Sequence, residues 1–387
     1  MPDGGDTITA RTVSAITEIG AEQWNAIACA DGAPYNPFVS FEFLDALEQS
    51  KSATPETGWG ATHVVLERAG QIIGLAPLYL KGHSQGEYVF DHHWADAYHR
   101  AGGRYYPKLL SAAPFTPATG PRLLTAQSLD RPLLAKVLIQ IAEQYGVSSA
   151  HVNFIDDETG DALREAGFLA RVGEQYHWFN RDYQCFDDFL SALSSRKRKT
   201  IRRERRDAAA SDIVIRPLRG SEITPRHWDQ FWIFYQDTGA RKWGAPYLTR
   251  DFFHIVSETM RDDLLLFVAE RNDEPIAGAL NFIGGDTLYG RYWGCTESVP
   301  FLHFELCYHC AIDYAITEGL ARVEAGAQGD HKLARGYEPV ATQSAHWIRD
   351  PSFRDAIKNY LAAERRQTDA DIDALKAYTP YRKNNST

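Results

Sequence analysis

The chain is poor in features that would restrict it to a secreted or membrane-bound class. No stretch approaches the ~20 consecutive apolar residues that a membrane-spanning helix requires. The first twenty residues contain no basic segment followed by an apolar one, so we expect no secretory signal and a cytoplasmic protein. Cysteines are few, odd in number and scattered, which favours reduced thiols over a disulfide framework. They are Cys29, Cys185, Cys295, Cys307 and Cys310.

Composition and length indicate a globular protein of more than one domain. The 387 residues are 44% hydrophobic and 24% charged, enough to build a sizeable core under a charged surface. Length alone favours two domains. We predict an N-terminal module at residues 1–182 and a C-terminal module at residues 183–387, with the boundary near Tyr183. The net charge of -10 argues against binding of nucleic acid over the whole surface, and we expect no DNA partner.

Two segments about 200 residues apart have the pattern of the same short hairpin. They are His63–Leu80, HVVLERAGQIIGLAPLYL, and Leu266–Ile283, LFVAERNDEPIAGALNFI. Each is an apolar strand that ends in Glu-Arg, followed by a polar turn and a second, glycine-containing strand. A repeat at this distance predicts a duplicated module, because solenoid repeats recur every 20–50 residues or so.

Hydrophobic periodicity and punctuation predict the remaining elements. Residues 81–121, rich in Gly, His, Tyr and Pro, are expected to form a long loop with short strands. The alternation in Thr287–Gly294 predicts a strand with Tyr289, Arg291 and Trp293 on one face. The expected helices include Leu123–Tyr145, a helix from Asp187 through Leu193 into the following basic run, Thr224–Thr238, Thr249–Met260, Phe301–Glu318 and Phe353–Leu375.

The strongest charge feature is Arg196–Arg206, RKRKTIRRERR, with eight basic residues and one acidic residue. Eight positive charges on one helix cannot all pair internally, so the run is a candidate polyanion-binding surface. The alternatives are a solvated helix face or a helix docked on the acidic remainder of the chain. The candidate ligands are tRNA, an anionic lipid surface, which would bring the protein into peripheral contact with a membrane, and a pyrophosphate-bearing lipid precursor. The proposed contact residues are Arg196, Lys197, Arg198, Lys199, Arg202 and Arg203.

Motifs distributed over nearly the whole chain carry a family resemblance. They are HSQGEYVFDHHWADAY (83–98), GGRYYPKL (102–109), FTPATGPRLL (115–124), LSSRKRKTIRRERR (193–206), TGARKWGAPYLT (238–249), LYGRYWG (288–294), HFELCYHCAIDYAI (303–316) and EAGAQGDHKLARGY (324–337). With the doubled hairpin, the chain resembles the FemAB-like branch of the GNAT acyltransferases, which is linked to peptidoglycan peptide-bridge synthesis. The resemblance implies an α/β fold of two tandem GNAT-like modules with mixed sheets.

The same resemblance implies transfer of an aminoacyl or acyl group from an activated donor onto an amine that could be lipid-linked. FemAB-like enzymes take an aminoacyl group from charged tRNA, whereas ordinary GNAT enzymes hold coenzyme A on a glycine-rich turn before a helix. The corresponding segment here, CTESVPFLHFEL (295–306), has no glycine pair. Aminoacyl-tRNA and acyl-CoA both remain open as donors, and no tightly bound cofactor is expected.

Acyl transfer to an amine needs a proton acceptor and donors for the oxyanion. The residues at the start of the helix and after the next strand supply candidates. Glu305, Glu324 and His331 are the candidate catalytic acceptors, and His303 and Lys332 are candidate substrate-binding residues. The alternative is structural, with Glu324 and Lys332 as an ion pair and His303 as a helix cap.

Three further groups are candidates for substrate binding. Arg291 and Trp293 lie on the strand expected to floor the cleft. In a predicted loop at 241–246, Arg241 and Lys242 can clamp a carboxylate or phosphate while Trp243 stacks on the ligand. Asp91 and His92 belong to a cluster whose spacing matches no zinc pattern, so we expect substrate contact there and no metal. Trp243 could instead cap the core, and the segment of Asp91 and His92 could form a hydrogen-bonded loop.

Two other functions fit the sequence. One is an acyl-CoA-dependent N-acyltransferase acting on a lipid-like amine, which the many aromatic residues would accommodate. The other is a non-catalytic module that recognises peptidoglycan precursors through the basic helix and an aromatic cleft.

Overall fold

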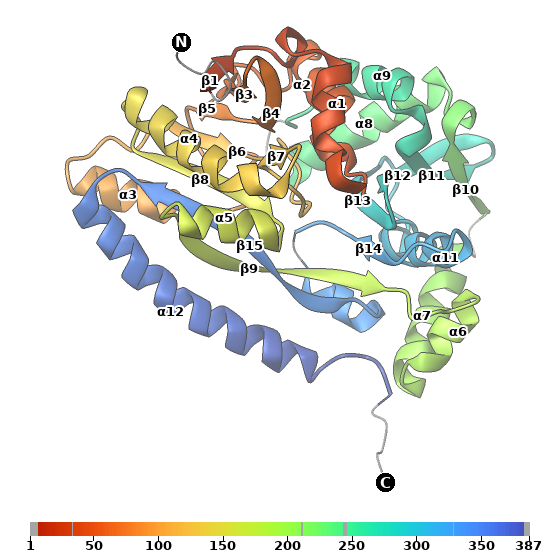
Figure 1. The fold of residues 1–387 in the computed structure, drawn as a ribbon. Coiled ribbons are helices and arrows are strands. Elements are labelled where there is room, and N and C mark those ends of the chain that lie inside the picture. Colours follow the sequence, from red (N-terminus) through yellow and green to blue (C-terminus); the bar gives the residue numbers. More distant parts are fainter. Residues whose placement is uncertain (1–6, 33, 210–211, 243–245, 328, 383–387) are drawn as a thin grey trace. The chain divides into compact units, whose positions relative to one another are not determined.

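The computed structural model describes residues 7–32, 34–209, 212–242, 246–327 and 329–382 (Figure 1). The chain forms two compact units that are not consecutive halves of the sequence. The first unit runs to Gly173 and includes Ala341–Ala370, and the second is Glu174–Val340 with the residues from Asp371 onward. This division differs from a single boundary near Tyr183, because β9 (Leu169–Phe179) and β15 (Glu338–Ile348) each contribute residues to both units.

The first unit contains two groups of paired strands. One has the order β1-β3-β4-β7, and the other has the order β15-β8-β6-β5-β2. Strands β2 and β3 are separated only by Thr62, and β4 and β5 only by two residues, so the N-terminal hairpin passes from one group to the other. The bounds are β1 Ile8–Val13, β2 Trp59–Ala61, β3 His63–Arg68, β4 Gln71–Ala76, β5 Tyr79–Lys81, β6 Lys108–Ser111, β7 Leu124–Thr125 and β8 Ser149–Ile155.

Both predicted hairpins are present, and both have the tight turn that suits strand twist. In the first, Arg68 pairs with Gln71 across Ala69 and Gly70, which have φ of 50° and 78°. In the second, β11 (Leu264–Arg271) joins β12 (Glu274–Gly284) through two residues with φ of 51° and 63°. Positive φ at both central residues defines the turn whose twist matches antiparallel strands. The repeat therefore corresponds to one hairpin in each unit.

Helices cover the sheet of the first unit through an apolar core. α4 (Arg131–Gln144) contributes Leu134 and Leu138, which pack with Val152 of β8. A smaller cluster joins Trp94 and Leu361. The remaining helices that contribute to this unit are α1 Ala21–Ala28, α2 Phe41–Gln49, α3 His92–Arg100, α5 Asp157–Glu165 and the N-terminal part of α12 Pro351–Lys376.

The second unit has strand order β10-β11-β12-β13-β14-β9. The long helix α8 approaches β12 and β13 closely, because an added Cβ at Gly294 would lie 2.1 Å from the carbonyl oxygen of Phe234. On the other face, Ala279 and Leu288 pack with Leu306 in the main core. The bounds are β10 Ile213–Arg219, β13 Thr287–Cys295, β14 Arg322–Glu324, α6 Phe186–Ala192, α7 Ser195–Ala209, α8 Pro225–Lys242, α9 Arg250–Thr259, α10 Leu302–Phe304 and α11 Cys310–Thr317.

Several sequence predictions of local structure are wrong. The expected loop at 81–121 contains the helix α3 in addition to a short strand of the expected kind, β6, and the first part of the expected helix Leu123–Tyr145 forms strand β7. The helix expected to run from Asp187 into the basic run is two helices, because Leu193 is extended at φ -84° and ψ 158°. A π-helical segment, Glu305–His309, interrupts the helix predicted at Phe301–Glu318. These breaks depend on tertiary packing, which overrides local periodicity.

No helix among the described residues combines the length and apolar character that a membrane span needs.

We predict that Gly294→Ala is strongly destabilising, by about 3 kcal/mol or more, because the new methyl group meets helix backbone that cannot rotate away. Gly82→Ala is the matched control, since its Cβ has only one neighbour, at 3.9 Å, and should change stability by no more than about 0.5 kcal/mol. Denaturant unfolding of both variants measures the difference. Equal stability of the two variants would contradict the close approach of α8.

Candidate functional site

Two strands of the second unit separate after a short parallel ladder. β13 pairs with β14 only from Thr287 opposite Arg322 to Tyr289 opposite Glu324. β14 then ends, while β13 continues to Cys295. The separation leaves a gap beside the second half of β13, at the carboxyl end of the parallel pair. Such an edge is where open α/β sheets usually bind ligands.

A β-bulge at Arg291 changes which side chains face the gap. Asn281 of β12 pairs with Gly290, and its neighbour Leu280 pairs with Tyr292, so Arg291 is an extra residue in the register of β13 against β12. Since directly opposed residues share a face, Trp293 lies on the face of Asn281, opposite to Tyr289. The prediction that Tyr289, Arg291 and Trp293 share one face is therefore wrong, because a bulge shifts the alternation by one residue.

A cavity of about 120 Å³ lies at this bulge. That volume holds a few water-sized groups, enough for a reacting carbonyl and its neighbours but not for a whole substrate. Three predicted binding residues, Arg291, Trp293 and His303, contribute to its wall. The complete lining is Ala279, Leu280, Asn281, Gly290, Arg291, Trp293, Tyr292, His303, Cys307, Tyr308 and Ala325.

Two histidines and a tyrosine border the cavity. The Nε2 atom of His331 lies 2.8 Å from the hydroxyl oxygen of Tyr308. The ring of His303 is 5.5 Å from that of Tyr308 and 5.2 Å from that of Trp293. His303 lies just before the π-helical segment, and Tyr308 lies within it. Such segments are frequent at functional sites. His331 thus reaches the cavity through Tyr308.

Lys332 is buried, with 1% of its surface exposed, and its Nζ donates a hydrogen bond of 2.8 Å to the carbonyl oxygen of Gly326. Burial lowers the pKa of Lys332 to about 7; the Cys307 thiolate would raise this pKa, and the charge of Arg291 lowers it. Within the described residues, no carboxylate forms an ion pair with Lys332. A buried lysine without a counter-ion is deprotonated in part near neutral pH. The suggested ion pair of Lys332 with Glu324 is therefore absent.

The two glutamates predicted to be catalytic point to other partners. Glu305 accepts a 3.0 Å hydrogen bond from Nε of Arg205. Glu324 lies 3.4 Å from Nε of Arg322 and 3.9 Å from Nε2 of His177. Neither side chain is among those that line the cavity. His331 is not a lining residue either, but it contacts Tyr308, which lines the cavity.

Sequence analysis missed Glu204, a buried carboxylate that holds the segment carrying His331. Arg335 donates two hydrogen bonds to Glu204, of 2.6 and 3.1 Å, and Nε2 of His309 lies 3.0 Å away. Arg335 also donates to the carbonyl oxygen of His331 at 2.7 Å. Burial would raise the pKa of Glu204, yet His309 and Arg335 hold this pKa below its ordinary value. The sequence signal that could have identified Glu204 is its place as the single acidic residue in the basic run Arg196–Arg206.

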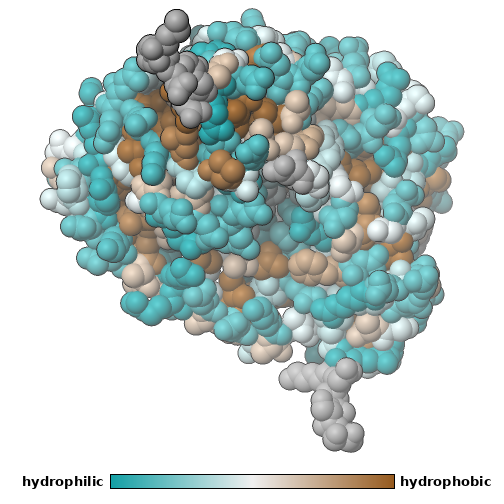
Figure 2. All heavy atoms as spheres, in the orientation of Figure 1, coloured by the Kyte–Doolittle hydropathy of each residue, from teal (hydrophilic) through white to brown (hydrophobic). Residues whose placement is uncertain are grey.

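The rest of α7 divides into paired and unpaired cations. Arg202 pairs with Asp187 at 2.9 Å, and Arg205 also contacts Asp313 at 3.1 Å. Over the described part of the chain, five cations of the helix have no carboxylate partner. Figure 2 shows hydrophilic residues gathered over α6 and α7, at the lower right of the view. The five are Arg196, Lys197, Arg198, Lys199 and Arg203.

A surface groove of about 420 Å³ lies along this side of α7. Its lining combines two hydroxyl groups with three of the unpaired cations: Ser195, Thr200, Arg196, Lys199 and Arg203. Positive charge near a helix N-terminus is unfavourable because the helix dipole is also positive there. An anion bound in this groove would offset the charge of the cations and the positive end of the helix dipole. The geometry is compatible with the polyanion-binding prediction for this helix, which stays a prediction.

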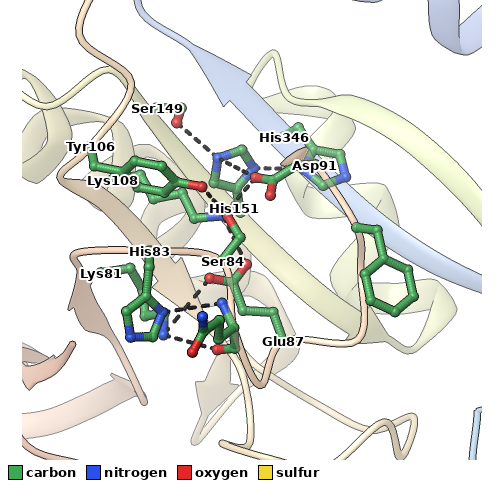
Figure 3. A network of polar contacts seen from close by, with 12 residues as sticks. Lys81, His83, Ser84, Glu87, Asp91, Tyr106, Lys108, Ser149, His151 and His346 are labelled. Carbon is green, nitrogen blue, oxygen red and sulfur yellow. Dashed lines mark hydrogen bonds and ion pairs between the residues drawn. The ribbon is translucent and has the colours of Figure 1, made fainter. Parts of the chain in front are cut away.

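In the first unit, a buried ion-pair network surrounds Lys108 (Figure 3). Nζ of Lys108 donates to Asp91 at 2.6 Å, to Glu87 at 2.8 Å and to Ser84 at 2.7 Å. Burial would lower the pKa of Lys108, but the two carboxylates raise this pKa above its ordinary value. Asp91, predicted to contact substrate, is thus engaged within the fold.

The network continues across the strands on one face. Tyr105 donates to Asp91 at 2.7 Å and lies 3.3 Å from Nε2 of His151, whose Nδ1 is 2.7 Å from Nδ1 of His346. Burial lowers the pKa of His151 to about 3. His92, the other predicted residue of this segment, is exposed at the start of α3.

The remaining predicted group is incompletely described. Arg241 and Lys242 belong to the end of α8, so the prediction of a loop beginning at Arg241 is wrong. Trp243 lies outside the described residues. As for metals, no group of three His, Cys, Asp or Glu side chains in the described ranges has the arrangement of a metal site.

Comparison with solved structures supports the fold. FemX matches with a TM-score of 0.52 and 13% identity, over 87% of this chain and 98% of that one. The C-terminal domain of a putative lysylphosphatidylglycerol synthetase from Agrobacterium fabrum matches at 0.54 and 10% identity, over 90% and 97%. L-PGS from Bacillus licheniformis matches at 0.50 and 10%, over 90% and 98%. The predicted α/β fold of two GNAT-like modules with mixed sheets is confirmed.

No curated protein matches the chain significantly in sequence. A family model described as peptidoglycan biosynthesis/recognition, FemAB-like, matches residues 15–383. The match spans both units and includes the bulged strand, Lys332 and the basic helix. The chain therefore belongs to the FemAB-like family of peptidoglycan biosynthesis and recognition proteins.

Proposed function

We propose that this protein is an aminoacyltransferase that moves an aminoacyl group from an activated ester onto an amine, with the cavity at Arg291 as its reaction site. The observation that carries the proposal is Lys332, a buried amine with a pKa of about 7 on which the charges of Arg291 and Cys307 act, and both of those residues line the cavity. An amine must lose a proton to become a nucleophile and another after attack. A base with a pKa near the working pH is the best acceptor for that proton.

The reaction follows from these groups. The acceptor nitrogen attacks the carbonyl carbon of the ester, and Lys332 takes the proton that the nitrogen releases. The negative charge that develops on the carbonyl oxygen is stabilised by the positive side chain of Arg291 and by backbone N–H groups at the bulge. The bond between the carbonyl carbon and the ester oxygen then breaks, and Lys332 returns the proton to the leaving oxygen. No covalent enzyme intermediate is needed.

The basic groove of α7 favours aminoacyl-tRNA as the donor. Three unpaired cations, Arg196, Lys199 and Arg203, line the groove, and Lys197 and Arg198 lie on the same helix. Such a set suits a chain of phosphates, and each phosphate contact releases counter-ions. The segment between β13 and α10 has no glycine-rich turn for a pyrophosphate, which disfavours acyl-CoA. For the acceptor, the family supports an amine of a peptidoglycan precursor.

The first test of this proposal is the activity of Lys332→Met. Purified protein is given tRNA charged with a radiolabelled amino-acid mixture and a peptidoglycan precursor peptide, and product is detected as a mass gain of one amino-acid residue. We expect the rate to fall by about 10²-fold or more, because the general base is lost. In the unsubstituted protein the rate should rise with pH up to about 7, as Lys332 becomes neutral.

Lys136→Met is the control, since Lys136 is exposed on α4 and should leave the rate unchanged. A Lys332→Met variant that keeps its fold and retains a rate within about threefold would eliminate Lys332 as the base.

A second prediction concerns the charge of Lys332 without any substrate. Lysines labelled with ¹³C at Cε should give two NMR signals that titrate near pH 7, from Lys81 and Lys332, and one of the two should be missing from Lys332→Met. Because the pKa of Lys332 is lowered on folding, the unfolded chain binds more protons between pH 7 and 10.5. The resulting destabilisation is absent above pH 10.5 and complete below pH 7.

Lys332→Met should therefore gain stability relative to the unsubstituted protein as the pH falls, by as much as about 4 kcal/mol across this window. Denaturant unfolding at several pH values measures the gain. A pH-independent difference would show that Lys332 is charged in the folded protein.

A third prediction addresses the donor. Replacing Arg196, Lys199 and Arg203 by Gln should weaken binding of aminoacyl-tRNA about tenfold or more and reduce the salt dependence of binding, because phosphate contacts are lost. The control replaces Arg202 and Arg206, which are paired with Asp187 and Asp207. Filter binding at several salt concentrations measures both. If the triple variant loses affinity for anionic vesicles and keeps its affinity for tRNA, the groove binds lipid instead.

A further inference from the structure

A strand position is vacant at one edge of the first unit. β1 runs antiparallel to β3 from Ile8 opposite Arg68 to Val13 opposite His63. If β1 continued, Ala15 would lie opposite Ala61 of β2. Instead β1 ends at Val13, and among the described strands β2 pairs only with β5. At the other edge of β2 the N–H of Trp59 donates to the carbonyl oxygen of Thr54 at 2.7 Å, so the vacant part of this edge is at Ala61.

Glu18 causes β1 to end. Its Oε1 atom accepts hydrogen bonds from the backbone N–H groups of Ser14 at 2.8 Å and Ala15 at 3.1 Å. Glu18 thereby binds the backbone N–H groups of the two residues that would continue β1, of which one would face β2 in an extended strand. The carboxylate thus turns the chain away into a short 3-10 helix, Ile16–Glu18. The vacant position results from a specific local contact.

The backbone of Ala61 faces the vacant position. Thr62 N–H donates to Leu78 at 2.8 Å, and Gly58 accepts from Gly82 N–H at 3.3 Å, so the even-numbered residues of this strand bond toward β5. In an antiparallel ladder successive residues bond to opposite sides. The N–H and C=O of Ala61 therefore point to the side that β1 has left.

A groove of about 600 Å³ occupies this place. Its wall includes hydroxyl groups of Thr12, Ser14, Thr62 and Tyr145, together with Gly58, Gly60 and Gly82. Glu18 is its only charged lining residue, and Oε2 of that carboxylate has no hydrogen-bond partner among the described residues. The groove is thus rich in hydroxyl groups and weakly acidic at one end.

We propose that this groove binds a short peptide in extended conformation, which adds as a strand to β2, with small side chains and its free amino group toward Glu18. Main-chain hydrogen bonds to an exposed strand edge are a recurrent mode of peptide recognition. The three glycines present no side chain to the groove, so the backbone of a bound peptide can approach them closely. A phosphate or carboxylate ligand does not fit, because the lining contains a carboxylate and no cation. This site is formed by elements of the first unit and is independent of the proposed reaction site.

The direct test uses tri-alanine as the probe and the full chain. With ¹⁵N-alanine labelling, the amide signal of Ala61, identified by its absence in Ala61→Gly, should shift on saturable titration. Ala61→Pro removes the donor that faces the groove while sparing the ladder to β5. It should weaken binding about tenfold. Thermal unfolding checks that the variant folds; if it does not, Tyr145→Phe at the groove rim replaces it and should weaken binding in the same direction.

The role of Glu18 has its own matched pair of probes. Tri-alanine should bind about threefold more tightly than N-acetyl-tri-alanine, as expected for a surface ion pair. Glu18→Gln keeps an oxygen that can accept from Ser14 and Ala15, removes the charge, and should abolish this preference.

Three results would overturn the proposal. They are the absence of saturable tri-alanine binding, a shift that spares the Ala61 amide, and a folded Ala61→Pro variant with unchanged affinity. Concentration-dependent dimerisation in sedimentation that Ala61→Pro abolishes would assign the groove to a second copy of the chain and would also overturn it.

Discussion

Taking an ammonium group out of water costs free energy. The groups that compensate this cost decide whether a buried lysine of this protein stays charged. Lys108 is completely buried, but two carboxylates, Glu87 and Asp91, surround its Nζ and raise its pKa. It remains charged and ties the covering segment to the sheet. Lys332 is also buried, and among the described residues its Nζ bonds only to a carbonyl oxygen, so its pKa falls to about 7. Burial therefore leaves a fixed cation where carboxylates lie at hydrogen-bonding distance, as at Lys108, and a titrating amine where they do not, as at Lys332.

Helix α7 connects the exposed cations to the reaction site. Its inward residues, Glu204 and Arg205, bind Arg335 and Glu305, which belong to the segments on either side of the cavity wall. Its outward residues form the basic groove. A donor bound at the groove would thus rest on a helix already fixed to the segment that carries His331 and Lys332. The acid within the basic run matters as much as the bases, because it provides this anchoring.

Much of the architecture could be predicted from the sequence. The two hairpins, the strand at Thr287 and the helix after it follow from apolar spacing and turn residues, which are local properties. Of the residues predicted in two separate groups, Arg291, Trp293 and His303 line one cavity, and His331 contacts its wall through Tyr308. The bulge at Arg291 could not be predicted, because it depends on the register between β12 and β13. Glu305 and Glu324 were predicted to be catalytic because of their residue type. Packing places them beside Arg205 and Arg322, which the sequence pattern does not indicate.

The sequence by itself determined the family, the duplicated hairpin and the concentration of positive charge on one helix, since these are properties of composition and local pattern. Only the tertiary structure decided which groups are chemically active. A lysine becomes a base, and a glutamate becomes an anchor, through the loss of water and the nearness of other charges. Both are set by residues distant in the sequence: Arg291 beside Lys332, and Arg335 on Glu204. The vacant strand position at Ala61 likewise appears only when the register of β1 is known.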